Sequence, residues 1–300
     1  LAAALLSKAK IKTLPVFTCS DFGNINTNVP GLTQLSNIGL WLSGDNLAAY
    51  YEPTKSEIKS GPLSFFSRMA WLAGNDEQPT IRINGTEKSS LNNVRIDLFY
   101  DEGKKRFVGT GFCSATNYFN QYQKMTGMKN EAFEYFEELV SSVFKNAKLI
   151  SYNPLGEFKI LNSVFSFHFE IESLAYDDDK ILLNLGESNC GIFANLPENT
   201  ELFHNQRTSP IHLPCQMSQN IKLNLDLNGL DLISYPEDKL IKNEAGNFGI
   251  TSKITGKKLT ITRSLTLAKT YYTGEEWLQF RTLLLADRNE NNRLILIDED

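Results

Sequence analysis

Two stretches after residue 93 alternate apolar and polar side chains, and this alternation constrains the fold more than any other feature of the chain. Residues 94–100 and 106–112 each have the pattern of a strand, and the charged residues 101–105 between them are typical of a hairpin turn. A period of two places alternate side chains on a buried face and on an outer face. Further strands are expected at 148–152, 163–174, 180–185, 219–226, 230–234, 248–255 and 258–267. Strands with turn signals between them favour mostly antiparallel, sandwich-like β domains.

Helical inserts interrupt this β region. In residues 131–148 apolar side chains recur every three or four positions and acidic ones lie opposite, which is typical of a helix with one buried face. Phe136 and Phe144 belong to the apolar side and are expected in the core. A shorter helix is expected before it, at residues 117–125.

The C-terminal end is expected to close with a helix and a strand. Residues 273–286 have a helical spacing that places Trp277, Phe280 and Leu284 on the inner face. Residues 293–297 are expected as a final edge strand.

A chain of 300 residues is long enough for two or three domains. Its first part reads as the end of a helix, at residues 1–8, followed by short strands at 13–18, 37–42 and 47–51. We therefore expect three regions: a mixed helix–strand domain at 1–75, a β-rich middle region at 76–200 with a helical insert at 114–147, and a C-terminal β domain at 201–300. The expected fold class is α+β.

Charge and hydropathy exclude two classes of partner. The net charge is −5, and basic residues are scattered except at Lys8, Lys10 and Lys12, which a solvated helix end explains. Nucleic-acid binding needs clustered Lys and Arg, so it is not expected. No apolar run approaches the roughly 18–20 residues that span a bilayer. A protein or peptide partner remains open.

No metal or cofactor site is expected from the residues. The cysteines contain no CxxC pair, and the three histidines have no cysteine at metal-ligand spacing (Cys19, Cys113, Cys190, Cys215; His168, His204, His212). Asp177–Asp179 is followed by apolar Ile181 and Leu182 where a calcium loop needs an oxygen ligand and a glycine, so it reads as a hairpin turn. His168 alternates with Phe165, Phe167 and Phe169 and should point away from them, beside Glu170 or Glu172.

Two segments resemble a known family. Residues 1–54 contain a helix end, the strand Leu14-Pro15-Val16, the triplet Ser36-Asn37-Ile38 and the hairpin end Tyr50-Tyr51-Glu52-Pro53-Thr54. This order resembles the second half of the transglutaminase-like (papain-like) core of multidomain bacterial proteins. Residues 207–297, with Arg207-Thr208-Ser209-Pro210-Ile211 and the closing helix, look like the C-terminal β domain of unknown function that accompanies that core.

The resemblance implies a Cys–His–Asp active site, and this chain departs from it. The family's nucleophilic cysteine would lie upstream of Leu1, Ile38 stands where the family has histidine, and Glu52 stands where it has aspartate. Isoleucine cannot accept a proton or orient an imidazole. No residue is therefore assigned a catalytic role, and Glu52 is only a remnant of the acidic triad position.

The sequence thus favours a non-catalytic fragment of a transglutaminase-like bacterial protein, with a scaffold or binding role in the periplasm or cell envelope. One alternative is a cysteine acyl-transfer enzyme, of the peptidase or transglutaminase type, whose nucleophile precedes Leu1. A further alternative is a peptide- or glycan-binding β-sandwich module. No cofactor is expected.

Overall fold

The structure is a computed structural model. It describes residues 2–18, 35, 37–44, 47–51, 68–74, 80–83, 89–116, 119, 133–134, 136–137, 140–141, 143–144, 146–155, 162–172, 174–177, 180–185, 204–208, 210–213 and 215–298. Two compact units divide the chain: unit 1 comprises residues 1–88 and 210–216, and unit 2 comprises residues 89–209 and 217–300. The expected domain boundaries after residues 75 and 200 stay predictions.

Unit 1 contains one helix and a five-stranded sheet with the order β3-β2-β1-β4-β5. Its elements are α1 (Ala2–Lys8), β1 (Lys12–Thr18), β2 (Asn37–Gly44), β3 (Leu47–Tyr51), β4 (Arg68–Leu72) and β5 (Thr80–Ile83), and β12 (Ile211–His212) also belongs to this unit. Neighbouring strands of the sheet are antiparallel. Val16, Ala70 and Leu72 form its buried core.

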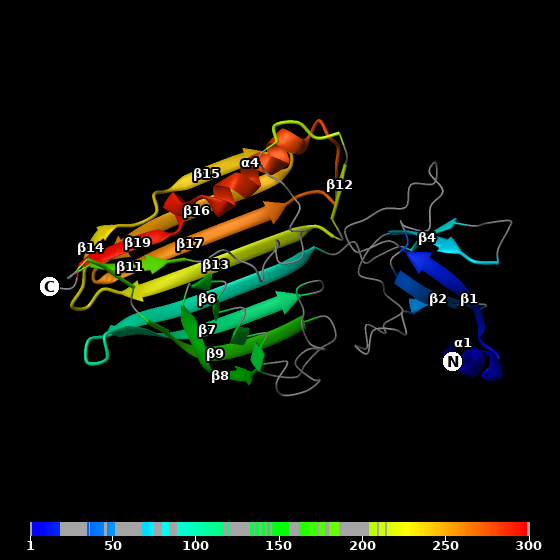
Figure 1. The fold of residues 1–300 in the computed structure, drawn as a ribbon, viewed down its shortest axis with the longest axis horizontal. Coiled ribbons are helices and arrows are strands. Elements are labelled where there is room, and N and C mark those ends of the chain that lie inside the picture. The colour runs from blue at the N-terminus through cyan, green and yellow to red at the C-terminus, as the bar shows by residue number, and fades with distance from the viewer. Residues whose placement is uncertain are drawn as a thin grey trace. The chain divides into compact units, whose positions relative to one another are not determined.

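Unit 2 is built on an eight-stranded sheet with the order β15-β16-β17-β13-β6-β7-β9-β8 (Figure 1). Its strands are β6 (Ser90–Asp101), β7 (Arg106–Thr116), β8 (Ala147–Pro154), β9 (Asn162–Glu172), β13 (Met217–Asp226), β15 (Lys239–Asn243), β16 (Gly246–Thr255) and β17 (Lys258–Leu267). Nearly all neighbours are antiparallel, but β6 and β13 at the centre run parallel. The expectation of mostly antiparallel strands is therefore confirmed, and the parallel central pair is the exception to it.

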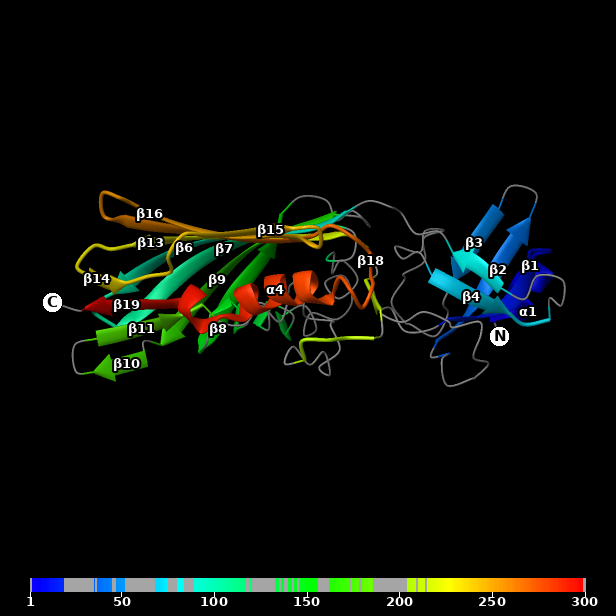
Figure 2. The same cartoon turned by 90° about the horizontal axis from the view of Figure 1, so that it is seen from above.

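A smaller sheet and a helix pack on one side of the large sheet. The smaller sheet has the order β10-β11-β19-β14, from β10 (Leu174–Asp177), β11 (Lys180–Asn184), β14 (Asp231–Ser234) and β19 (Leu294–Asp298). Figure 2 shows β11, β19 and the helix α4 (Trp277–Arg288) together on one side of β16 and β13. Between α4 and β19 lies a short 3-10 helix, Glu290–Asn292, and β18 (Tyr271–Tyr272) precedes α4.

Two predictions at the C-terminal end need correction. The last strand is internal, since β19 pairs with β11 on one side and β14 on the other. The expected final edge strand is therefore wrong, and its burial explains why, because Ile295 and Ile297 are fully buried. The closing helix begins at Trp277 and not at Thr273, and the turn before it contains two hydrogen bonds between Thr273 and Glu276, of 2.9 and 3.3 Å.

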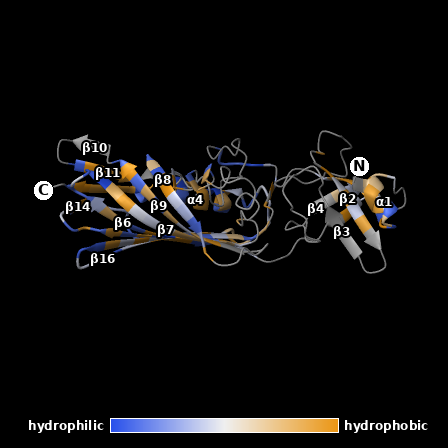
Figure 3. Cartoon of the chain, turned by 90° about the horizontal axis from the view of Figure 1, so that it is seen from below, coloured by the Kyte–Doolittle hydropathy of each residue, from blue (hydrophilic) through white to orange (hydrophobic). Residues whose placement is uncertain are grey.

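Along β6, β7 and β17, buried and exposed side chains alternate as the apolar and polar residues do in the sequence. Figure 3 colours the strands by the hydropathy of these residues. On β9, Phe165, Phe167 and Phe169 are at most 1% exposed, whereas His168 is exposed, which confirms its predicted face. Glu170, one of the two expected partners of His168, pairs with Arg106 at 2.5 Å, and the alternative pairing with Glu172 stays a prediction.

The inner face of β7 is shaped to accept these rings. Gly109 and Gly111 lie opposite Phe169 and Phe167 in the register. A Cβ atom on Gly111 would approach the Phe167 ring to 2.0 Å. Glycine at these positions therefore lets buried aromatic rings lie across the neighbouring strand.

The helical insert packs against the same rings. Residues 133–134, 136–137, 140–141 and 143 are helical, and Phe136 and Phe144 are fully buried, as predicted. Phe136 contacts Phe165 with ring centroids 5.0 Å apart. The expected helix at 117–125 lies outside the described residues, apart from Phe119.

With few helices and many strands, the described structure is mostly β. This corrects the expected α+β class to a β-rich fold. Long runs with a period of two form strands, so most of the chain's regular structure is in sheets. The helices are short and pack against those sheets.

Candidate functional site

The position that the family resemblance assigns to a histidine is occupied by an exposed apolar side chain. Ile38 on β2 lies opposite Phe17 of β1 and is 55% exposed. Phe17 in turn lies opposite Trp71 of β4, with ring centroids 5.7 Å apart. These three side chains form an apolar row across the sheet, and none of them can act as a general base. Glu52 and Cys19 lie outside the described residues.

The other predicted candidates are not gathered into one site. Cys113 and Cys215 are buried, and the Cys113 thiol lies 3.6 Å from the Asn92 side-chain oxygen. Among the described residues, no group of three His, Cys, Asp or Glu side chains could hold a metal ion. His204 contributes its backbone carbonyl to Trp277, and Cys190 is outside the described residues.

A polar surface covers the outer face of the large sheet. We call it the open face, and it consists of the outward-facing side chains of five adjacent strands: Thr260, Thr262, Ser264 and Thr266 of β17; Ser218, Asn220, Lys222 and Asn224 of β13; Leu91, Asn93, Arg95, Asp97 and Phe99 of β6; Val108, Thr110, Phe112 and Ser114 of β7; and Ser166, His168 and Glu170 of β9. Most of these side chains are polar or charged, and the apolar members are Leu91, Val108 and the two exposed rings Phe99 and Phe112.

The parallel strands β13 and β6 form the centre of the open face, and their pairing brings polar side chains opposite one another. Asn220 lies opposite Asn93, Lys222 opposite Arg95, and Asn224 opposite Asp97. The Asn220 amide donates a hydrogen bond of 2.9 Å to the Asn93 oxygen.

A second set of hydrogen bonds continues this centre along the strands. The Asn224 amide donates to the Asp97 carboxylate at 2.7 Å, and Thr260 donates to the Asn224 oxygen at 3.1 Å. The centre of the open face is thus held by side-chain hydrogen bonds across three strands.

Two phenylalanines stand exposed among these polar groups. Phe112 is 42% exposed and lies between Arg95 of β6 and Ser166 of β9 in the register. Phe99 is 47% exposed, further along β6. Exposed rings on this face can supply contact area to a ligand, and their polar neighbours can supply directed hydrogen bonds.

Around α4 the contacts are structural. The Arg207 guanidinium lies 5.3 Å from the Trp277 ring centroid, which joins the Arg-containing loop to the closing helix. Lys269 and Glu276 form an ion pair, and the hydrogen bond between them raises the pKa of Lys269 and lowers the pKa of Glu276. Burial raises the pKa of Tyr272 to about 12, and its hydroxyl donates to the Ala245 carbonyl at 2.9 Å.

The polar side chains of the open face are visible in the sequence, because they alternate with apolar side chains along each strand. Asn93, Arg95 and Asp97 occupy every second position of β6, and Asn220, Lys222 and Asn224 do the same in β13. Their meeting was not predicted, since the two strands lie 127 residues apart in the sequence.

The described helices include none with the length and apolar character that a bilayer span requires.

Comparisons with known proteins find a family match for part of the chain. Residues 189–297 match the family described as "Domain of Unknown Function with solved-structure structure (DUF3858)". No curated protein matches the chain. One similar solved structure is the crystal structure of a "putative protease" from Parabacteroides distasonis ATCC 8503, with 13% sequence identity and a TM-score of 0.49. The alignment covers 99% of this chain and 42% of that chain, so this chain spans less than half of that protein's length.

Proposed function

We propose that this chain is a non-catalytic part of a transglutaminase-like bacterial protein and acts as a binding module in the periplasm or cell envelope. The family match of residues 189–297 overlaps the segment 207–297 that resembles the family's C-terminal β domain, which supports this origin. The exposed isoleucine at position 38 supports a non-catalytic role, because a hydrocarbon side chain transfers no proton.

The open face is the ligand-contacting surface in this proposal. The observation that carries it is the exposure of Phe112 and Phe99 among amides, hydroxyls and charges on adjacent strands. A buried ring would serve packing alone, whereas a ring that is 42% exposed on a sheet face loses hydrophobic stabilisation unless a ligand covers it.

Replacing Phe112 by alanine is therefore expected to weaken ligand binding about tenfold, which corresponds to about 1.4 kcal/mol. The measurement is affinity electrophoresis of the full chain through gels that contain a panel of soluble polysaccharides and peptides, comparing the wild type with Phe112→Ala. The matched control is Leu278→Ala, which removes a 53% exposed apolar side chain from α4. Equal retardation of Phe112→Ala and the wild type would contradict this placement of the surface.

A further inference from the structure

We propose that the open face recognises a polysaccharide that carries carboxylate groups. This inference rests on the binding role proposed above and names its ligand class. It is carried by a cation at the centre of the face that has no ion-pair partner among the described residues, by the hydrogen-bonding groups around that cation, and by the neighbouring ring.

The cation is Lys222. It lies directly opposite Arg95 across the parallel strands, and like charges in this position repel each other. The Arg95 guanidinium is 3.2 Å from the Asp97 carboxylate, which also accepts the Asn224 amide. In the described part of the chain no carboxylate lies within ion-pair distance of Lys222. A carboxylate on a ligand would relieve the repulsion and gain charge-assisted hydrogen bonds.

The groups around this cation suit a hydroxylated ligand. Asn93 and Asn220 bond to each other through one donor and one acceptor, and each amide has further donor or acceptor capacity. Thr262 lies beside Lys222 on β17. Such groups bond equally well to hydroxyls that donate and hydroxyls that accept, as sugars present.

Phe112 supplies the apolar part of the same site. It lies opposite Arg95 on β7, so the ring and the two cations occupy one row across three strands. One face of a pyranose ring is lined by C–H groups and packs against an aromatic ring, while the hydroxyls at its edge reach the flanking amides.

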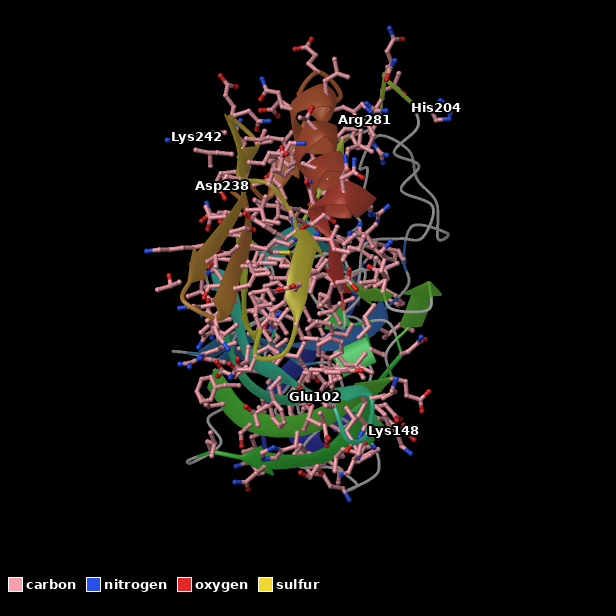
Figure 4. The ribbon with its side chains drawn as sticks, turned by 90° about the vertical axis from the view of Figure 1, so that its left-hand side faces the viewer. Glu102, Lys148, His204, Asp238, Lys242 and Arg281 are labelled. Carbon is pink, nitrogen blue, oxygen red and sulfur yellow. The ribbon has the colours of Figure 1, made fainter. Side chains whose placement is uncertain are left out.

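A polysaccharide fits this surface better than an acidic peptide does. Extended peptides bind to sheets mainly by adding a strand to an open edge, where backbone groups are unpaired. The open face lies on central strands whose backbones are paired on both sides. The edge strands β15 and β8 carry lysines, among them Lys242 and Lys148, labelled in Figure 4, and edge lysines discourage strand addition.

The test compares two polymers that share one sugar backbone. Polygalacturonate carries free carboxylates, and fully methyl-esterified polygalacturonate has them capped. We expect the full chain to bind polygalacturonate at least about tenfold more tightly than its ester, and Lys222→Gln to remove most of that difference. Lys257→Gln, which removes an exposed lysine at the turn between β16 and β17, should leave both affinities unchanged.

The other outcomes separate this inference from the proposed function. Equal binding of polygalacturonate and its ester, still weakened by Phe112→Ala, would overturn the carboxylate requirement and leave the binding role standing. Binding of poly-glutamate as tight as that of polygalacturonate would overturn the polysaccharide class. Failure to bind any polymer of the panel would overturn both proposals.

Discussion

Replacing Phe144 by alanine is expected to lower the free energy of unfolding of unit 2 by about 3–5 kcal/mol, the cost of removing a fully buried phenylalanine. Phe144 is 0% exposed and stacks on Phe169 of β9, with ring centroids 5.6 Å apart. It also lines a small apolar cavity together with Leu185 and Leu223, and loss of the ring would enlarge that cavity.

Chemical denaturation of the full chain measures this effect. Phe99→Ala is the matched control, because it removes the same ring from a position that is 47% exposed and should change stability by less than about 1 kcal/mol. If Phe144→Ala and Phe99→Ala shifted the midpoint equally, the insert would not pack on β9 as described.

The second large effect is expected at the buried ion pair between α4 and β17. Arg263 and Asp287 are 6% and 7% exposed, and the Arg263 guanidinium donates a hydrogen bond of 2.7 Å to the Asp287 carboxylate. The same guanidinium also donates to the Asp287 backbone carbonyl. Asp287→Ala would leave the Arg263 charge buried without its counter-ion, at a cost of about 3–5 kcal/mol.

A double replacement distinguishes charge burial from simple loss of packing. With both groups apolar, as in Arg263→Met combined with Asp287→Leu, the Arg263 charge is no longer buried without its counter-ion. Arg293 keeps the Asp287 backbone carbonyl as its acceptor, so stability should return toward that of the wild type. Lys104→Ala is the exposed control, since its ion pair with Asp101 spans 3.9 Å at the surface and contributes about 0–1 kcal/mol. A double variant as unstable as Asp287→Ala would contradict this explanation.

Strand positions were predictable because burial repeats with period two. The strand at 258–267 was predicted with the bounds of β17, and the two strands at 94–100 and 106–112 lie within β6 and β7. The strand β15 was missed, since Lys239–Asn243 is short and mostly exposed and so carries little hydrophobic pattern.

Strand partners were not predictable in the same way. A period-two pattern shows which side chains share a face but not which strand lies beside it. The parallel pairing of β6 with β13, and the internal place of β19, therefore required the structure. The open face depends on that pairing, because Lys222 and Arg95 meet only across it.

The central claim is that ligand binds on the open face, and hydroxyl-radical footprinting of the full chain with polygalacturonate tests it most directly. The account predicts that saturating polymer protects Phe99 and Phe112 from oxidation, while Leu278 on α4 and Leu240 on the edge strand β15, 53% and 77% exposed, stay as reactive as in the free chain. Bound polymer that leaves Phe99 and Phe112 fully reactive, or that protects Leu278 instead, would contradict the claim.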